Sequence, residues 1–172
     1  MTWEPELEEL RQRQALAREM GGPDKIARQR AAGRLTVRER IGALLDSGSF
    51  HEIGSITGNG TYDETGALQS MTPTNFLFGR GLIEGRRVVV AGDDFTVRGG
   101  ASDASIIEKQ VAAEQMAHEL RLPMIRLIEG SGGGGSVKSL EAMGYTYVPF
   151  LPGFDHMVRN LATVPVVSLG LG

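Results

Sequence analysis

The chain has 172 residues, 41% of them hydrophobic, with a net charge of −3 and a pI near 5.7. This length supports one folded α/β unit or a piece of a larger one. The acidic balance, without zinc-finger spacing or an arginine-rich tract, predicts no nucleic-acid partner. The sequence contains no cysteine, signal-peptide core or membrane-length apolar run. We therefore expect a cytoplasmic protein with no disulfide, no thiol chemistry and no membrane partner.

The first elements along the chain are predicted helices. Residues 4–20 are rich in Leu, Ala, Arg, Glu and Gln, which favour a helix, and its apolar stripe is thin. The Gly-Gly-Pro run at 21–23 is a stop signal for that helix. Asp24 can cap a second, short helix that ends near Gly33.

A third helix is predicted from Thr36 and Glu39, whose spacing is that of a capping box ahead of an apolar run. Residues 1–50 are therefore expected to form an N-terminal helical segment, and residues 51–172 a partial domain of their own. Within that second part, the polar stretch 54–73 predicts a loop or a weak edge strand.

The next elements predict a β-hairpin followed by a helix. Residues 76–83 and 87–92 are apolar runs joined by a short turn, as in two antiparallel strands. A helix with one apolar face should then start after Ser102 or Asp103 and end before Pro123.

A further strand is predicted at residues 124–128, which completes a ββα unit and leads into a glycine-rich loop. Short helices are expected around 137–143 and 155–162, and a last strand at 164–169. Residues 170–172 have the pattern of a loop that has only begun, so we expect a truncated chain.

The glycine-rich loop, residues 128–136, is the first candidate for a binding site. Successive glycines lose much conformational freedom on folding, which is offset when their bare N–H groups bind something. The loop lacks the Gly-Lys-Ser/Thr triplet of a phosphate-binding Walker loop. A G-x-G-x-x-G spacing starts at Gly130, yet residues 164–172 offer no acid for a ribose. We predict main-chain donors for an oxyanion, a thioester carbonyl or the backbone of a ligand. The alternatives are tight strand–helix packing and a flexible linker.

A second glycine-containing loop, at residues 93–100, also follows an apolar strand, so the two loops are expected to form one cleft. Asp93 and Asp94 are candidates for acids or metal ligands, or for a charge at a helix N-terminus. No role is assigned to the histidines, which lack paired-ligand or catalytic-triad spacing: His51, His118 and His156.

Several blocks of sequence match one protein family in the family's own order. They are Gly33 to Phe50, Gly79 to Val90, Asp94 to Gly100, and Ser131-Gly132-Gly133. These blocks resemble the N-terminal part of the carboxyltransferase (β) subunits of biotin-dependent acyl-CoA carboxylases, of the propionyl-CoA and methylcrotonyl-CoA carboxylase type. The family commonly continues with Ala-Arg, where this chain has Gly134 and Gly135.

The resemblance implies an α/β, crotonase-like fold of ββα units, here an incomplete N-terminal domain preceded by a helical segment. It also implies transfer of a carboxyl group from carboxybiotin to the α-carbon of an acyl-CoA substrate. The biotin would be carried by a partner, a biotin carboxylase or biotin carrier subunit, and the site would form between complementary domains of a homo-oligomer. No metal is expected in this chain.

The resemblance further implies CoA contacts from eight residues: Phe95, Thr96, Gly99, Gly100, Ser131, Gly132, Gly133 and Gly134. The catalytic oxyanion loop is expected just after Gly172, so no catalytic residue is assigned and the chain alone is expected to be inactive. Two alternatives remain. One is a non-catalytic CoA-binding or assembly module that uses the helix at 4–20 for interaction, and the other is a different crotonase-like enzyme, such as a hydratase or decarboxylase.

Overall fold

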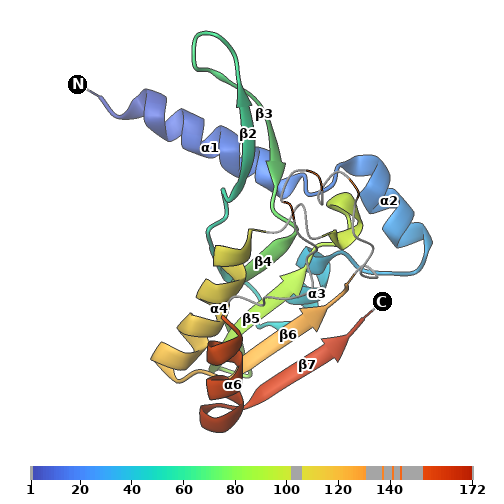
Figure 1. Ribbon diagram of the computed structural model, residues 1–172, viewed down its shortest axis with the longest axis vertical. Helices are drawn as coiled ribbons and strands as arrows, with labels where there is room; N and C mark the ends of the chain where they lie inside the picture. Colours follow the sequence, from blue (N-terminus) through green and yellow to red (C-terminus); the bar gives the residue numbers. More distant parts are fainter. Residues whose placement is uncertain are drawn as a thin grey trace.

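The computed structural model describes residues 2–101, 106–130, 137, 141, 144 and 153–171. Its strands are β1 (His51–Ile53), β2 (Gly58–Tyr62), β3 (Leu68–Pro73), β4 (Phe76–Ile83), β5 (Arg86–Asp93), β6 (Met124–Ile128) and β7 (Val166–Gly170). A five-stranded sheet has the order β1-β4-β5-β6-β7, and β2 pairs with β3 apart from it. Strand β4 is antiparallel to β1 and β5, whereas β5, β6 and β7 run parallel (Figure 1).

Helices cover both faces of the five-stranded sheet. The helices in the described part of the chain are α1 (Glu4–Arg18), α2 (Pro23–Ala31), α3 (Val37–Leu44), α4 (Ile107–Leu120) and α6 (Phe154–Thr163), with a short 3₁₀ turn at Arg98–Gly100. Helix α3 packs on one face, and α4 packs on the other with α6 beside it (Figure 1). A parallel sheet buried on both faces has strands that are apolar almost throughout. The apolar character of β5 and β6 has this origin.

The predicted capping box at the start of α3 is confirmed. The Thr36 hydroxyl accepts a hydrogen bond from the Glu39 amide at 3.3 Å, and the Glu39 carboxylate accepts one from the Thr36 amide at 2.7 Å. The prediction for α2 is wrong in detail, because Gly22 is the N-cap and Asp24 lies in the first turn. Pro23 suits the first helical position, and an acid in the first turn complements the helix dipole.

The predicted hairpin of β4 and β5 is confirmed, with the register running from Phe76 opposite Asp93 to Ile83 opposite Arg86. The Asp46 carboxylate accepts hydrogen bonds from the amides of Glu84 and Gly85, at 2.9 and 2.8 Å, and so holds the turn. Alternate residues of β5 enter the two cores, with Val88 and Val90 toward α3, and Val89 and Ala91 toward α4.

The polar stretch predicted as a loop or a weak edge strand is instead a complete hairpin, β2–β3, so that prediction is wrong. The hairpin stands beside α1, away from the main sheet (Figure 1). The Arg13 guanidinium lies 5.5 Å from the centroid of the Tyr62 ring. Beside the hairpin turn, hydrogen bonds led by the Thr65 hydroxyl lower the pKa of Asp63 to about 2.

Among the remaining described elements, β1 was not predicted, and α4 begins at Ile107 with Ile106 as its N-cap, later than expected. Helix α4 ends before Pro123, with Arg121 in the left-handed region at φ 50°. Strand β6 coincides with its predicted range, and α6 and β7 follow close to theirs. The expected caps at Ser102 and Asp103 lie outside the described residues, as does most of the helix expected at 137–143.

The N-terminal segment contributes to the core of the sheet. Val37, Ile41 and Leu45 are buried in one cluster with Leu77, Val88, Val90, Ile125 and Leu127. Helix α3 is therefore built into the same packing as β4, β5 and β6. The domain boundary expected near residue 50 stays a prediction.

At the β7 edge of the sheet, apolar side chains are exposed to solvent and a polar side chain is buried. Helix α6 buries Asn160 and leaves Val158 and Leu161 49% and 67% exposed. On β7, Val167 and Leu169 are exposed as well. They continue the row formed by their neighbours on β6, Ile125 and Leu127, beyond the part of the sheet that α3 covers. Strand β7 thus forms an apolar margin, which joins the core through the partly buried Val166.

Candidate functional site

The carboxyl ends of β5 and β6 lie side by side, as the two-loop hypothesis requires. Gly92 is opposite Leu127 in the parallel register, and the Glu129 amide donates to the Asp93 carboxylate at 3.1 Å. Residues 93–101 and Gly130 therefore leave the sheet next to each other. Ligands of open α/β sheets bind at this edge. Ser131, Gly132, Gly133 and Gly134 lie outside the described residues.

Asp94 shapes the first loop. Its Oδ1 accepts hydrogen bonds from the amide and the hydroxyl of Thr96, at 2.9 and 2.6 Å. Burial raises the pKa of Asp94, although these hydrogen bonds oppose the shift, and burial likewise raises the pKa of Asp93. Both carboxylates thus receive hydrogen bonds from the main chain at the strand ends.

Thr96 faces the protein, where it braces the loop against the corner between α1 and α2. It is 2% exposed, and its hydroxyl accepts a hydrogen bond from the Gly21 amide at 3.0 Å. A Cβ on Gly21 would lie 1.8 Å from the Thr96 carbonyl oxygen, so the two main chains are in direct contact. The hydroxyl is therefore engaged within the protein, whereas Phe95, the preceding residue, is half-buried.

Gly99 brings bare main chain of the first loop to open space. Arg98, Gly99 and Gly100 are all left-handed, with φ of 51°, 63° and 70°. A Cβ on Gly99 would meet no atom within 4 Å, and the same holds for Gly130 at the end of β6. Nothing therefore blocks the approach of a ligand to the main chain at Gly99 and Gly130. Bare main-chain N–H groups can bind an oxyanion or a carbonyl oxygen.

Glu129, immediately before the glycine-rich loop, is a buried carboxylate that sequence reasoning missed. It is 2% exposed, and its Oε2 accepts hydrogen bonds from Arg40 and, at 3.3 Å, from Gln29. The Arg34 guanidinium lies 3.7 Å from Oε1. The only signal in the sequence was an acid that ended an apolar strand.

A second buried charge cluster, also missed, surrounds Lys109 on α4. Lys109 donates to the Gly54 carbonyl at 2.9 Å and lies 3.9 Å from the Glu52 carboxylate. Arg38 binds the same carboxylate through both terminal nitrogens, at 2.8 and 3.3 Å. Burial lowers the pKa of Lys109 to about 8, although Glu52 opposes the shift.

The depressed pKa of Lys109 predicts that stability rises with pH. Between about pH 8 and the ordinary value of 10.5, the unfolded chain still holds a proton that the folded chain has released. The free energy of unfolding should therefore increase over this interval, by about 3 kcal/mol for this residue. Urea titrations from pH 7 to 10.5 measure the effect, with Lys109→Met as the control for other groups. Parallel curves for the two proteins would contradict the prediction.

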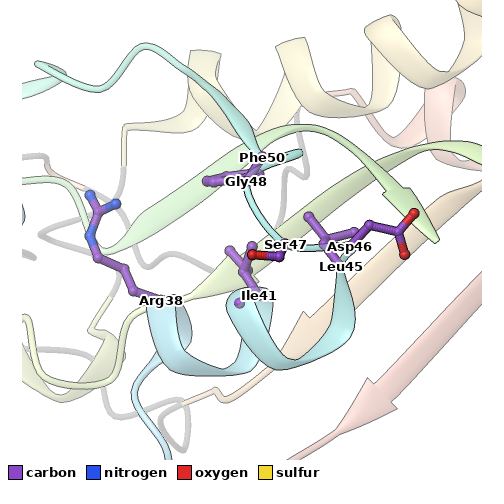
Figure 2. Close-up of a pocket in the computed structure, with 8 residues that line it drawn as sticks. Arg38, Ile41, Leu45, Asp46, Ser47, Gly48 and Phe50 are labelled. Carbon is purple, nitrogen blue, oxygen red and sulfur yellow. The ribbon is translucent and has the colours of Figure 1, made fainter. Parts of the chain in front are cut away.

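A hollow of about 400 Å³ lies along α3 and the chain after it, lined by Arg38, Ile41, Gly42, Leu45, Asp46, Ser47, Gly48 and Phe50. Figure 2 shows Arg38 at one end of the hollow and Asp46 at the other. None of the predicted CoA-binding residues lines it. In the part of the chain that the structure describes, no three His, Asp or Glu side chains form a group able to hold a metal ion. No described helix is long and apolar enough to cross a membrane.

The fold is that of an α/β protein with bare main chain at Gly130, directly after β6, and at Gly99, in the loop after the neighbouring parallel strand β5. The chain belongs to the Carboxyl transferase domain family, which matches residues 28–148. The predicted family is thereby confirmed.

Curated relatives agree with this family. The propionyl-CoA carboxylase beta chain of Roseobacter denitrificans is 34% identical over 167 residues, which cover 96% of this chain and 32% of that protein. The propionyl-CoA carboxylase carboxyltransferase subunit of Haloferax mediterranei is 35% identical, over 93% of this chain and 36% of that protein. The methylmalonyl-CoA decarboxylase alpha subunit of Veillonella parvula is 28% identical. The chain spans about a third of the length of these relatives.

Solved structures confirm the predicted fold class. Transcarboxylase 12S, solved with methylmalonyl-coenzyme A and methylmalonic acid bound, superposes with a TM-score of 0.73 at 26% identity, over 98% of this chain and 32% of that chain. A single-chain, multi-domain long-chain acyl-CoA carboxylase gives 0.72 at 26% identity, over 95% of this chain and 17% of its own.

Proposed function

We propose that this chain is the acyl-CoA-binding third of a carboxyltransferase that moves a carboxyl group from carboxybiotin to the α-carbon of an acyl-CoA. The observation that carries the proposal is the open main chain at Gly130, directly after β6, and at Gly99, in the loop that follows the neighbouring strand β5 of a carboxyl transferase domain. The methylmalonyl-coenzyme A bound to transcarboxylase 12S supports the substrate class.

In this proposal, main-chain N–H groups of the two loops hold the CoA moiety. Phe95 and Gly99 contribute N–H groups from the first loop, and residues 131–134 from the second. Gly100, whose amide donates to the Val97 carbonyl at 3.1 Å, contributes close approach of the main chain. Thr96 acts by fixing the shape of the first loop, since its hydroxyl is engaged with Gly21 and Asp94. Donors that are oriented before the reaction stabilise a developing oxyanion without reorganisation. The catalytic oxyanion loop itself is expected after Gly172.

The proposed partners follow from the reaction. Carboxybiotin is delivered on a biotin carboxylase or biotin carrier subunit, and the complete site forms between complementary domains of a homo-oligomer. The names of the relatives, propionyl-CoA carboxylase subunits, support this arrangement. The proposed location is the cytoplasm.

Calorimetric titration of the 172-residue chain with CoA and propionyl-CoA tests the proposal. Binding is expected, and Gly130→Leu should weaken it at least tenfold, about 1.4 kcal/mol, because the side chain would fill the ligand's space. Gly42→Leu is the matched control, since Gly42 also borders open space but lies on α3. Its affinity should equal that of the unmodified chain.

Two outcomes would change the interpretation. No binding at millimolar CoA, or equal binding by the Gly130 and Gly42 variants, would contradict the proposed site. CoA binding by a protein completed with the remaining two thirds of the family, but without carboxyl transfer from a biotin carrier, would favour the non-catalytic module.

A further inference from the structure

We infer that Glu129 is a positioning residue, which ties the start of the glycine-rich loop to helices α2 and α3. We call this set of contacts of Glu129 the tether. The tether itself is a matter of packing, whereas its effect on CoA affinity rests on the proposed function. Glu129 is the last residue before Gly130, where a ligand can approach the main chain. A shift of Glu129 therefore moves the proposed donors directly.

The contacts of Glu129 come from four separate parts of the chain. Its amide donates to Asp93 at the end of β5, at 3.1 Å. Its Oε2 accepts hydrogen bonds from Gln29 on α2 and from Arg40 on α3. The Arg34 guanidinium, between these helices, lies 3.7 Å from Oε1. Contacts from several directions fix the position of a side chain, which a single ion pair does not do.

The partners of Glu129 are themselves held. Gln29 also donates to the Leu35 carbonyl at 3.0 Å, across the connection between α2 and α3. Arg30 donates to Glu39, and Glu39 closes the capping box with Thr36. The tether therefore ends in a rigid pair of helices. Rigid support of this kind keeps binding groups within a fraction of an ångström of their working geometry.

The charge on Glu129 explains why this site is built from cations. Asp93 and Asp94 lie close by and interact unfavourably with Glu129, raising their own pKa values in addition to the effect of burial. Arg40 and Arg34 are the compensating charges from α3 and the segment before it. An unpaired carboxylate would not stay buried at this place.

The tether gives the N-terminal sequence block, residues 33–50, a physical role. Arg34 and Arg40 belong to this block, and both reach the end of β6. The block thus contacts the start of the loop although the two are far apart in the sequence. Arg40 and Glu129, for example, are separated by 89 positions. Helices that contact no ligand would in this way set the geometry of the ligand loop.

Hydrogen exchange followed by mass spectrometry tests the tether without any ligand. In Glu129→Gln, the peptide containing Glu129 and Gly130 should exchange at least tenfold faster, while peptides of β4 and the first half of β5 keep their rates. Glu52→Gln is the matched control, because Glu52 is a largely buried carboxylate, 14% exposed, with an arginine partner, Arg38, and it lies on the edge strand β1. It should leave the loop peptide unchanged at comparable loss of stability.

CoA affinity supplies the second measurement, and Glu129→Gln should weaken the Kd at least fivefold relative to Glu52→Gln. Should Glu129→Gln fail to fold, Arg40→Lys, which keeps the charge but removes the guanidinium fork, is read in the same way. Loop exchange equal to that of the control overturns the inference and leaves the proposed function intact. Faster loop exchange in a chain that binds no CoA supports the tether and contradicts the function.

Discussion

Replacing Arg126 with methionine should lower the free energy of unfolding by about 3–5 kcal/mol. Arg126 on β6 donates to both carboxylate oxygens of Glu114 on α4, at 2.7 and 2.9 Å, and both side chains are largely buried. Without the guanidinium, Glu114 would keep a charge in the core with no cation to compensate it. Such a group is far more destabilising than the loss of the pair as a whole.

The same carboxylate also holds α6, which enlarges the expected effect. The side-chain amide of Asn160 donates to the Glu114 carboxylate at 2.8 Å and to the Glu114 main-chain carbonyl at 2.9 Å. Loss of Arg126 therefore weakens the packing of α4 against β6 and, through Glu114, the attachment of α6. The loss of one side chain would therefore weaken the contacts among β6, α4 and α6.

Urea unfolding followed by circular dichroism measures this prediction. Arg159→Met is the control, because its partner Asp155 is exposed and 3.9 Å away, and it should change stability by less than about 0.5 kcal/mol. The double variant Glu114→Met with Arg126→Met should recover much of the loss, since no charge remains buried. A single Arg126 variant within about 1 kcal/mol of the unmodified chain would refute the argument.

Gly21→Ala should destabilise the protein by about 2–4 kcal/mol, the sum of overpacking and one lost hydrogen bond. The added methyl group would lie 1.8 Å from the Thr96 carbonyl oxygen and 3.0 Å from the Thr96 Cβ. The corner between α1 and α2 must then move away, which breaks the hydrogen bond from the Gly21 amide to Thr96. The first glycine-containing loop would lose its brace, so CoA affinity should fall together with stability.

The same replacement at another glycine, Gly42→Ala, should change stability in the opposite direction. Gly42 lies inside α3, and a Cβ added there would meet no atom within 4 Å. Alanine should therefore stabilise the helix by about 0.5–1 kcal/mol. Thermal unfolding of the two variants side by side makes the comparison. Equal melting temperatures would show that the contact with Thr96 is soft and that the brace is dispensable.

The sequence predicts those elements whose cause is local. Residues within a few positions of each other decide the capping box at Thr36 and the turn of the β4–β5 hairpin. The β2–β3 hairpin escaped because its residues are mostly exposed, so that no apolar alternation marks it. Alternation of apolar and polar residues arises when one face of a strand is buried, so an exposed hairpin shows little of it.

In the candidate site, too, some features follow from nearby residues and others depend on residues far apart in the sequence. The two loop starts could be placed together from the strands that precede them, because parallel strands end at one edge of a sheet. The bracing of Thr96 by Gly21 joins residues 75 positions apart, and the pairing of Gln29 with Glu129 joins residues 100 positions apart. No short window of sequence contains both members of such a pair.

The outer strand β7 has a consequence for handling the protein. Its outward main-chain edge has no partner strand among the described residues, and the stretch from Val166 to Gly170 carries no charge. Lysine, proline or a bulge at such a place normally keeps foreign polypeptides from adding to a sheet. Their absence here leaves a surface to which any extended apolar peptide can adhere, so purified material should be kept dilute and examined for ordered aggregates.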